Sequence, residues 1–347
     1  MSAPRTIALL GAGGFIGSHL LERLTQRDDW DVIALDKTKE KIEHLDPTSY
    51  RYVDADIMGN SEELESVISQ SDWVVDLIAY ANPSLYVSSP IEVFDLNFTQ
   101  NLRIAELCIK YKRHLVQYSS AEVYGKVLEG GRYKEEDTDF LLGPVQKQRW
   151  IYSAAKSLLE RVIYAHGERG DLTYTIIRPF NFIGPRIDYL VPPRSTAGPR
   201  VFAHFISALL NQSNMFMVDG GDVHRAFLHI DDATDAFEQI LDQPDRSRNQ
   251  IYNIGNPDNN VTIRQFAELM LELYGEITGK APVSKLEDID GLEFYGEGYE
   301  DSDRLPPCIE KMNELGWSPQ HDLRKTLQDT MEFYLCKSGM PVNGCCS

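Results

Sequence analysis

Four glycines near the start of the chain restrict its fold more than any other feature of the sequence. They lie in the stretch LLGAGGFIGSHL, at Gly11, Gly13, Gly14 and Gly17. The apolar run 6–10 precedes them, and apolar residues at helical spacing follow them. Glycines between a strand and a helix let the backbone turn tightly and approach a diphosphate held at the helix N-terminus. The pattern predicts a nucleotide-binding turn; the alternative is an ordinary strand, turn and helix without a ligand.

A carboxylate follows the glycines at the distance that a dinucleotide-binding unit requires. The segment 30–35 is typical of a second strand, and it ends at Asp36, roughly 20 residues beyond the glycines. A carboxylate at that position binds ribose hydroxyls and repels a 2′-phosphate, so we expect NAD rather than NADP as the cofactor. The residues predicted to surround the cofactor at this point are Gly11, Gly14, Phe15, Ile16, Gly17 and Asp36.

Strand-like and helical segments alternate through the first half of the chain. The predicted strands are 73–79, 114–118 and 173–177, and the predicted helices are 90–110 and 150–165. This alternation predicts an α/β fold, a Rossmann-type doubly wound parallel sheet with helices on both faces. We expect residues 1–180 to form the NAD-binding domain, with residues of about 224–256 returning to it. Residues 181–347, where proline and glycine are frequent, should mainly form a smaller lobe that binds the substrate, with helices at 201–210 and 262–274.

The charge of the chain limits its partners. The formal net charge of −19 over 347 residues argues against nucleic acid or an anionic membrane. No apolar run approaches the length of about 20 residues that spans a bilayer, and the N-terminus lacks the apolar region of a signal peptide. We therefore expect a cytoplasmic protein, in which local arginines offset the overall charge wherever an anionic ligand binds.

The stretch YSAAK carries the clearest catalytic pattern. Tyr152 and Lys156 are four residues apart, which puts them on one face of a helix. An ammonium beside a phenol lowers the pKa of the phenol, so this tyrosine could take a proton from a sugar hydroxyl while hydride leaves for a nicotinamide. Ser119 and Ser120 close the preceding strand, where a serine can hydrogen-bond to the same hydroxyl. The alternative is a chance pair on a solvated helix.

Together these features resemble the extended short-chain dehydrogenase/reductase family. The residues that carry the resemblance, in the family's order and spacing, are those of GAGGFIG, Asp36, Asp56 in DADI, Ser120, Tyr152 and Lys156. The resemblance extends over nearly the whole chain. It implies that Asp56 and Ile57 flank the adenine and that Lys156 also contacts the nicotinamide ribose. It further implies a homodimer built on the helices near Asn97 and Tyr152.

Longer stretches narrow the resemblance to one branch of the family. They are QRWIYSAAKSLLERVIYAHG, IIRPFNFIGPRID, VDGGDVHRAFLHIDDA, IYNIGNP and EFYGEGYEDSDR. The branch includes plant UDP-apiose/UDP-xylose synthase and the C-terminal half of the bifunctional polymyxin-resistance enzyme. Its members oxidise C4 of UDP-glucuronic acid, and the resulting β-keto acid loses CO2. The resemblance implies an NAD-dependent UDP-glucuronate decarboxylase that makes UDP-4-keto-pentose, UDP-xylose or both.

Two residues are implied in the decarboxylation itself. Glu122 matches the acid of the branch motif S-x-E-V-Y-G, where a carboxyl group can handle the proton on the carbanion at C5. A surface charge is the alternative, although the end of a buried strand is a costly place for one. Arg304 in SDRLPP matches the arginine that binds the substrate carboxylate in the branch. The match requires that this chain lacks one residue of the branch pattern just before Arg304. Counting back from Trp317 favours that alignment. Arg186 and Arg194 are the substitute candidates.

The remaining implied contacts concern the UDP part of the substrate. Asn181, Arg200 and Arg225 match positions that contact UDP, and Tyr299 is a further predicted substrate contact. Arginines near a diphosphate supply the local positive charge that an acidic chain needs.

The chain also departs from the branch pattern at two positions. It has Ala81 and Ala121 where the plant synthase has cysteines, and the polymyxin-resistance enzyme has serine at the second position. Without those thiols, contraction of the sugar ring to apiose is not expected.

Two other functions remain open from the sequence. A UDP-uronate 4-epimerase would retain the carboxylate and release no CO2. A protein of another class, a catalytically silent NAD-binding regulator, would not need the set of Ser120, Tyr152 and Lys156, which this chain has.

Overall fold

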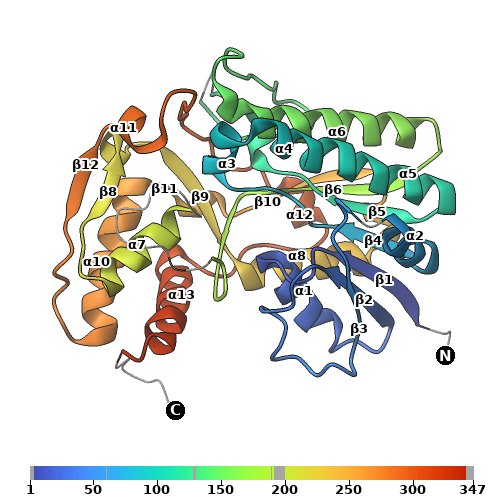
Figure 1. Ribbon diagram of the computed structural model, residues 1–347, viewed down its shortest axis with the longest axis horizontal. Helices are drawn as coiled ribbons and strands as arrows, with labels where there is room; N and C mark the ends of the chain where they lie inside the picture. Colours follow the sequence, from blue (N-terminus) through green and yellow to red (C-terminus); the bar gives the residue numbers. More distant parts are fainter. Residues whose placement is uncertain (1–3, 60, 128–129, 189, 191–199, 341–347) are drawn as a thin grey trace.

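The computed structural model describes residues 4–59, 61–127, 130–188, 190 and 200–340. Its larger lobe is built on one parallel sheet (Figure 1). In spatial order the strands are β10 (Gln250–Ile254), β6 (Thr173–Pro179), β5 (His114–Tyr118), β4 (Trp73–Asp76), β1 (Arg5–Leu10), β2 (Trp30–Asp36) and β3 (Arg51–Asp54). The chain runs outward from β1 on both sides, so the switch point lies between β1 and β4, where such sheets bind ligands. The predicted α/β fold class is confirmed.

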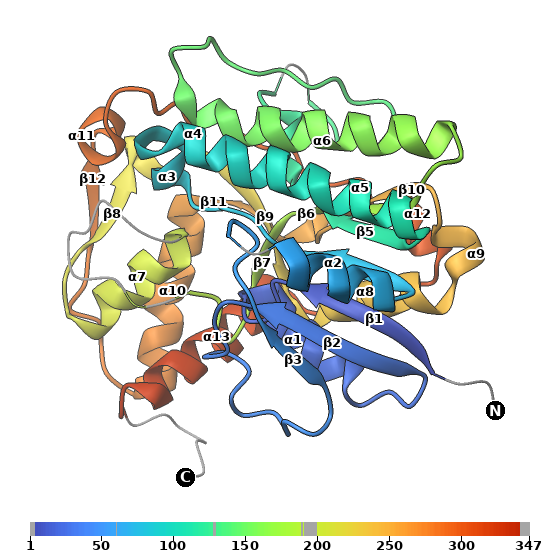
Figure 2. The same ribbon diagram turned by 45° about the vertical axis from the view of Figure 1, so that its right-hand side comes forward.

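Helices cover both faces of the parallel sheet (Figure 2). On one face lie α1 (Phe15–Leu24) and α8 (Ile230–Asp242); on the other lie α2 (Ser61–Gln70), α5 (Asn101–Tyr111) and α6 (Ile151–Glu168). Strands that are buried on both faces need near-continuous apolar runs, and residues 7–10 and 73–75 supply them. Because helices cover both faces of the sheet, polar side chains can gather only at its C-terminal edge.

The predicted strand 73–79 is shorter than expected, since β4 ends at Asp76. Oδ1 of Asp76 accepts a hydrogen bond from the N–H of Ile78 at 3.0 Å, and this local bond competes with the strand ladder. The chain therefore turns after Asp76, and residues 77–79 line a cavity at the edge of the sheet.

The predicted helix 90–110 is present, but it contains a widened turn. It consists of α4 (Pro90–Phe94), the π-helical segment η1 (Asp95–Gln100) and α5. Two buried asparagines lie at this turn: Asn97 donates to the carbonyl of Val93 at 2.8 Å, and Asn101 donates to the carbonyl of Ile78 at 3.2 Å. The second bond fixes the helix to the segment that follows β4. Such π-turns frequently occur at functional sites.

The smaller lobe contains two short sheets and several helices (Figure 1). One sheet has the order β11 (Asn260–Thr262), β9 (His224–His229) and β7 (Asn181–Ile183), and the other pairs β12 (Leu286–Ile289) with β8 (Met215–Val218). The helices of this lobe include α7 (Val201–Leu210), α10 (Ile263–Thr278), α11 (Gly291–Tyr295) and α13 (Leu323–Lys337). By contrast, α3 (Pro83–Ser88) contacts α4, α9 (Pro244–Ser247) contacts α8, and α12 (Glu310–Glu314) contacts β10. The helix expected at 262–274 begins after Thr262, because that side chain caps it with Gln265 in a capping box.

The range 224–256 divides between the two lobes. Strand β9 pairs with β7 and β11 in the smaller lobe, whereas α8 packs on α1 and β10 pairs with β6 in the parallel sheet. In the part of the chain that the structure describes, no helix has the length and apolar character of a membrane span.

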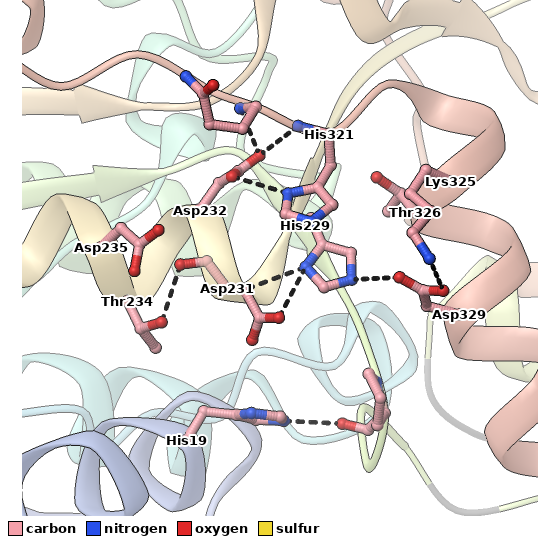
Figure 3. A network of polar contacts seen from close by, with 12 residues as sticks. His19, His229, Asp231, Asp232, Thr234, Asp235, His321, Lys325, Thr326 and Asp329 are labelled. Atoms are coloured by element: carbon pink, nitrogen blue, oxygen red, sulfur yellow. Dashed lines mark hydrogen bonds and ion pairs between the residues drawn. The ribbon is translucent and has the colours of Figure 1, made fainter. Parts of the chain in front are cut away.

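A polar network joins α8 to the segment before α13 (Figure 3). Nδ1 of His229 accepts a hydrogen bond from the N–H of Asp231 at 3.1 Å and so caps α8. The ring of His229 stacks on that of His321, with 4.2 Å between centroids. Asp232, which is buried, accepts hydrogen bonds from the side chain and backbone of His321. These contacts hold the last helix against the larger lobe.

Candidate active site

A cleft at the C-terminal edge of the parallel sheet contains three neighbouring cavities. The cofactor cavity is lined by residues that include Gly11, Gly14, Asp36, Asp56 and Ile57. The central cavity is lined by residues that include Ser120, Glu122, Tyr152, Arg149 and Arg304. The outer cavity is lined by residues that include Asn181, Arg200, Arg225, Tyr299 and Asp301. The first two cavities share Leu77 and Ala79, and the last two share Glu122 and Arg149, so the cleft is continuous.

The glycine turn of the cofactor cavity fits a diphosphate. Gly11 has a φ of +90°, a conformation that favours glycine. A Cβ atom on Gly17 would lie 2.2 Å from the carbonyl oxygen of Gly11, so only glycine lets α1 start this close to β1. The helix then presents its free N-terminal N–H groups to the cavity. The turn therefore fits a dinucleotide such as NAD.

Two carboxylates define the other side of the cofactor cavity. Asp36 accepts the N–H of Gly13 at 2.9 Å through Oδ2 and the N–H of Thr38 at 3.0 Å through Oδ1. Burial raises the pKa of Asp36, and these backbone hydrogen bonds oppose the rise. Each oxygen keeps a lone pair for a ribose hydroxyl. Asp56 accepts the N–H of Met58 at 3.0 Å, and Ile57 is buried beside it.

The other predicted cofactor residues have different positions. Ile16 lines the central cavity. Phe15 is buried, and the guanidinium of Arg200 lies 5.4 Å from the centre of its ring. Gly17 packs inside the turn rather than at the cavity wall.

Ser120 and Tyr152 meet in the central cavity. Ser120 lies two residues after the end of β5 and caps the short helix η2 (Ala121–Tyr124), accepting the N–H of Glu122 at 3.1 Å. Tyr152 lies in the first turn of α6, and its ring stacks on that of Tyr86 with 4.8 Å between centroids. Tyr86 also lines the cavity, and the sequence reasoning did not single it out. Its position in the short helix α3, which follows a proline, gave no periodic signal.

Burial dominates the pKa of Tyr152 in this structure. It raises that pKa well above its ordinary value, and a hydrogen bond with Ser120 acts in the opposite direction. The Lys156 ammonium is buried and donates to the carbonyl of Tyr118 at 3.1 Å and to Oδ1 of Asn101 at 3.3 Å. These two bonds direct the ammonium toward β5 and α5, and the lowering of the Tyr152 pKa by Lys156 stays a prediction.

Glu122 lies between two arginines. Its Oε2 is 2.8 Å from Nη1 of Arg149 and 3.0 Å from Nη2 of Arg304, and both arginines are almost fully buried. Burial alone would raise the pKa of Glu122, but the two guanidinium charges hold it well below the ordinary value of a glutamate. Arg304 also donates to the carbonyl of Gly125 at 2.7 Å. The carboxylate is therefore ionised and firmly held.

Arg149 is the functional candidate that sequence reasoning missed. It lies in the short helix η3 (Gln148–Trp150) and lines both the central and the outer cavity. Its guanidinium lies 4.6 Å from the centre of the Trp150 ring. The available signal was its spacing, because a residue three before Tyr152 lies on the same helix face.

The arginines of the outer cavity already have acidic partners. Nη2 of Arg225 is 2.6 Å from Oδ1 of Asp301. Arg200 binds Asp188 through two atoms, at 3.0 and 3.1 Å. Asn181 donates to the carbonyl of Ala226 at 3.2 Å. The ring of Tyr299 stacks on that of Tyr295, with 3.9 Å between centroids.

The substitute candidates for the substrate carboxylate are less well placed. Arg186 forms an ion pair with Glu22 at 2.7 Å, on α1, and it is not among the residues that line the three described cavities. Arg194 lies outside the described residues. Ala81 and Ala121 both line the central cavity, so the positions where the branch pattern has thiols or a serine face the reaction space.

Comparisons with known proteins agree with this geometry. Residues 7–255 match the NAD dependent epimerase/dehydratase family. UDP-D-apiose/UDP-D-xylose synthase from Oryza sativa subsp. japonica is 38% identical over 355 residues, covering 95% of this chain and 89% of the rice protein. UDP-D-apiose/UDP-D-xylose synthase 2 from Arabidopsis thaliana is 37% identical, covering 95% and 91%. The crystal structure of PbgP3 protein from Burkholderia pseudomallei has a TM-score of 0.86 at 33% identity, covering 97% of this chain and 98% of the other.

Proposed function

This chain belongs to the NAD dependent epimerase/dehydratase family, and we propose that it oxidises and decarboxylates UDP-glucuronic acid. One observation carries the proposal: two buried guanidinium groups, those of Arg149 and Arg304, flank Glu122 in the cavity that also contains Tyr152. Two cations beside one carboxylate can receive a second carboxylate, that of the substrate. The names of the two plant relatives point to a UDP-pentose as product, which is what UDP-glucuronic acid becomes when it loses CO2.

We propose NAD as the cofactor, with its adenosine half at Asp36, Asp56 and Ile57 and its diphosphate at the glycine turn. When bound, NAD accepts the hydride from C4 of the sugar. The two carboxylates of this cavity favour ribose hydroxyls over a 2′-phosphate, which carries the same charge as they do.

Tyr152 and Ser120 are the residues proposed to act at C4. Tyr152 takes the proton of the C4 hydroxyl as hydride leaves, and the Ser120 hydroxyl hydrogen-bonds to the same oxygen. Because burial raises the pKa of Tyr152, its phenolate needs positive charge nearby. Lys156, one helical turn further along α6, is the residue proposed to supply it.

Arg304 and Arg149 are proposed to orient the carboxylate for its loss. Once C4 is a ketone, the C5–C6 bond breaks, its electron pair enters the enolate of C4 and C5, and CO2 leaves. Holding the carboxylate fixes the breaking bond against the carbonyl. C5 then takes up a proton, and Glu122 is proposed to handle it. Glu122 is ionised and therefore has no proton of its own to give to C5. We propose that the proton comes from the Tyr152 phenol, which took it from the C4 hydroxyl.

The UDP part is proposed to lie in the outer cavity, against Asn181, Arg200, Arg225 and Tyr299. We also propose a homodimer built on α4 and α6. Ile91, Leu158 and Tyr164 on these helices are 74%, 45% and 48% exposed, and a second copy of the same face would cover them.

Incubation of the purified protein with UDP-glucuronic acid tests the proposal. We expect CO2 release and a UDP-pentose or UDP-4-keto-pentose as product, measured with and without added NAD. Conversion to UDP-galacturonic acid without CO2 release would favour the 4-epimerase. Binding of NAD and the UDP-sugar without turnover would favour the silent regulator, although the presence of Ser120, Tyr152 and Lys156 together speaks against it.

A further inference from the structure

A buried aspartate at the end of β4 interacts with Lys156 of α6. Asp76 is the last residue of β4 and has no exposed surface. Its Oδ1 accepts the N–H of Ile78 at 3.0 Å, and its Oδ2 accepts Nε2 of Gln117 at 3.0 Å. Both donors are neutral. A buried carboxylate without a directly bonded cation is costly unless a charge close by compensates it.

A chain of hydrogen bonds connects this carboxylate with Lys156. The amide of Gln117 donates both to Asp76 and to the carbonyl of Tyr118, the latter at 3.3 Å. The same carbonyl accepts Nζ of Lys156 at 3.1 Å. Asp76 and Lys156 are therefore joined through one amide and one carbonyl. Gln117 and Lys156 are both almost completely buried, so water does not screen the charges.

The other ionisable groups near Asp76 and Lys156 are neutral or already paired, which leaves Asp76 as the negative charge that balances Lys156. Glu160 lies one turn after Lys156 on α6, but it binds Arg178 through two oxygens and is neutralised there. Cys108 on α5 interacts with Asp76, and burial raises the pKa of that thiol, so it stays neutral. Burial also raises the pKa of Tyr152, so that side chain offers no counter-charge until it ionises. Burial lowers the pKa of Lys156, and the charges of Asp76 and Glu160 oppose that effect.

We propose that Asp76 is a positioning residue that keeps Lys156 protonated and aligned, and so sets the upper pH limit at which the site works. The inference rests on the proposed function only in taking Lys156 as the partner of Tyr152. Burial raises the pKa of Asp76 to about 6, so its charge is present at neutral pH and lost on acidification.

The test is Asp76→Asn, read by the 13Cε resonance of Lys156 in protein with labelled lysine. Removing the negative charge destabilises the ammonium, so the apparent pKa of Lys156 should fall by about one unit. The alkaline limb of kcat/KM for UDP-glucuronic acid should move to lower pH by the same amount. The variant can fold, because Gln117 Oε1 has no partner among the described residues and a rotated amide would accept the new N–H.

Asp232→Asn is the matched control. This aspartate is equally buried and accepts backbone N–H groups, but it lies in the network of Figure 3. It should lower stability without moving the titration of Lys156. An unchanged Lys156 pKa in Asp76→Asn would overturn the proposal even if the enzyme decarboxylates normally. Conversely, absence of decarboxylation in the unmodified protein would refute the proposed function and leave the resonance measurement valid.

Discussion

The two ends of the cleft are built in different ways. The cofactor cavity is formed where the first strands end, by short stretches around residues 11–14, 35–37, 55–58 and 77–80. The charged groups that line the central cavity come from distant parts of the chain; they are Glu122, Arg149, Arg200, Arg225 and Arg304. The first end is therefore a property of short motifs, and the second is a property of the tertiary fold.

The two ends also differ in charge. The charged groups of the cofactor cavity are Asp36, Asp56 and Lys37, which pairs with Asp56, whereas arginines dominate the central and outer cavities. Each of Arg200, Arg225 and Arg304 is paired with a carboxylate of the chain. An anionic substrate must share or displace those pairs, and removing one partner of a buried pair typically costs about 3–5 kcal/mol. Substitutions at the substrate end will therefore disturb stability more readily than those at the cofactor end.

The largest expected effect concerns Tyr152, where the two ends meet. Tyr152→Phe keeps the ring stacked on Tyr86 but removes the proton acceptor. Turnover of UDP-glucuronic acid should fall by about 10²-fold or more, the scale of one general-base contribution, with NAD affinity little changed. Tyr164→Phe on the same helix is the matched control, because that side chain is half exposed. Near-normal turnover in purified Tyr152→Phe would contradict the assignment.

Arg304 tests the substrate end alone. Arg304→Ala should weaken the use of UDP-glucuronic acid by at least about tenfold, since a charge-assisted pair contributes roughly 1.5–3 kcal/mol. Affinity for UDP, which lacks the carboxylate, should hardly change in isothermal titration. Arg304→Lys keeps the charge without the planar guanidinium, so its use of UDP-glucuronic acid should lie between that of the unmodified protein and that of Arg304→Ala. If Arg304→Ala decarboxylates normally, the alignment that selected it fails and Arg149 becomes the carboxylate partner.

The smallest expected effect concerns the cofactor end. Asp36→Ser removes the charge that repels a 2′-phosphate, and Lys37→Arg replaces an ammonium, which pairs with Asp56 at 3.3 Å, by a planar group of donors that suits a phosphate. The ratio of kcat/KM with NAD to that with NADP should fall by about tenfold, the value of one charge-assisted hydrogen bond. Weaker NAD binding is expected as well, because Asp36 also holds the N–H groups of Gly13 and Thr38. Use of both cofactors by the unmodified protein would contradict our view of Asp36.

The same contrast explains how far the sequence could be interpreted. The glycine turn, the strand ending at Asp36 and the helix 201–210 follow from local patterns, and the fold class and the family are confirmed. Arg149 was missed because its spacing from Tyr152 gives an arginine no role until its burial in the cleft is known. Strand β4 is short because the side chain of Asp76 accepts the N–H of Ile78, and the pattern of apolar residues in the sequence does not reveal such a bond. The pKa of Tyr152 is governed by burial, which the spacing of Tyr152 and Lys156 in the sequence leaves undetermined.

The widened turn of η1 has a consequence for what the chain can tolerate in evolution. A π-turn contains one residue more than the α-helical turn it replaces. Deleting one residue of 95–100 would close the widened turn to regular α-helix while the helix on either side kept its place. Deleting a residue of α4 would instead rotate everything beyond it by about 100°, the angle of one residue at 3.6 residues per turn, and Asn101 would leave both Ile78 and Lys156. Homologues that keep Lys156 should therefore show any gap in this helix at the widened turn.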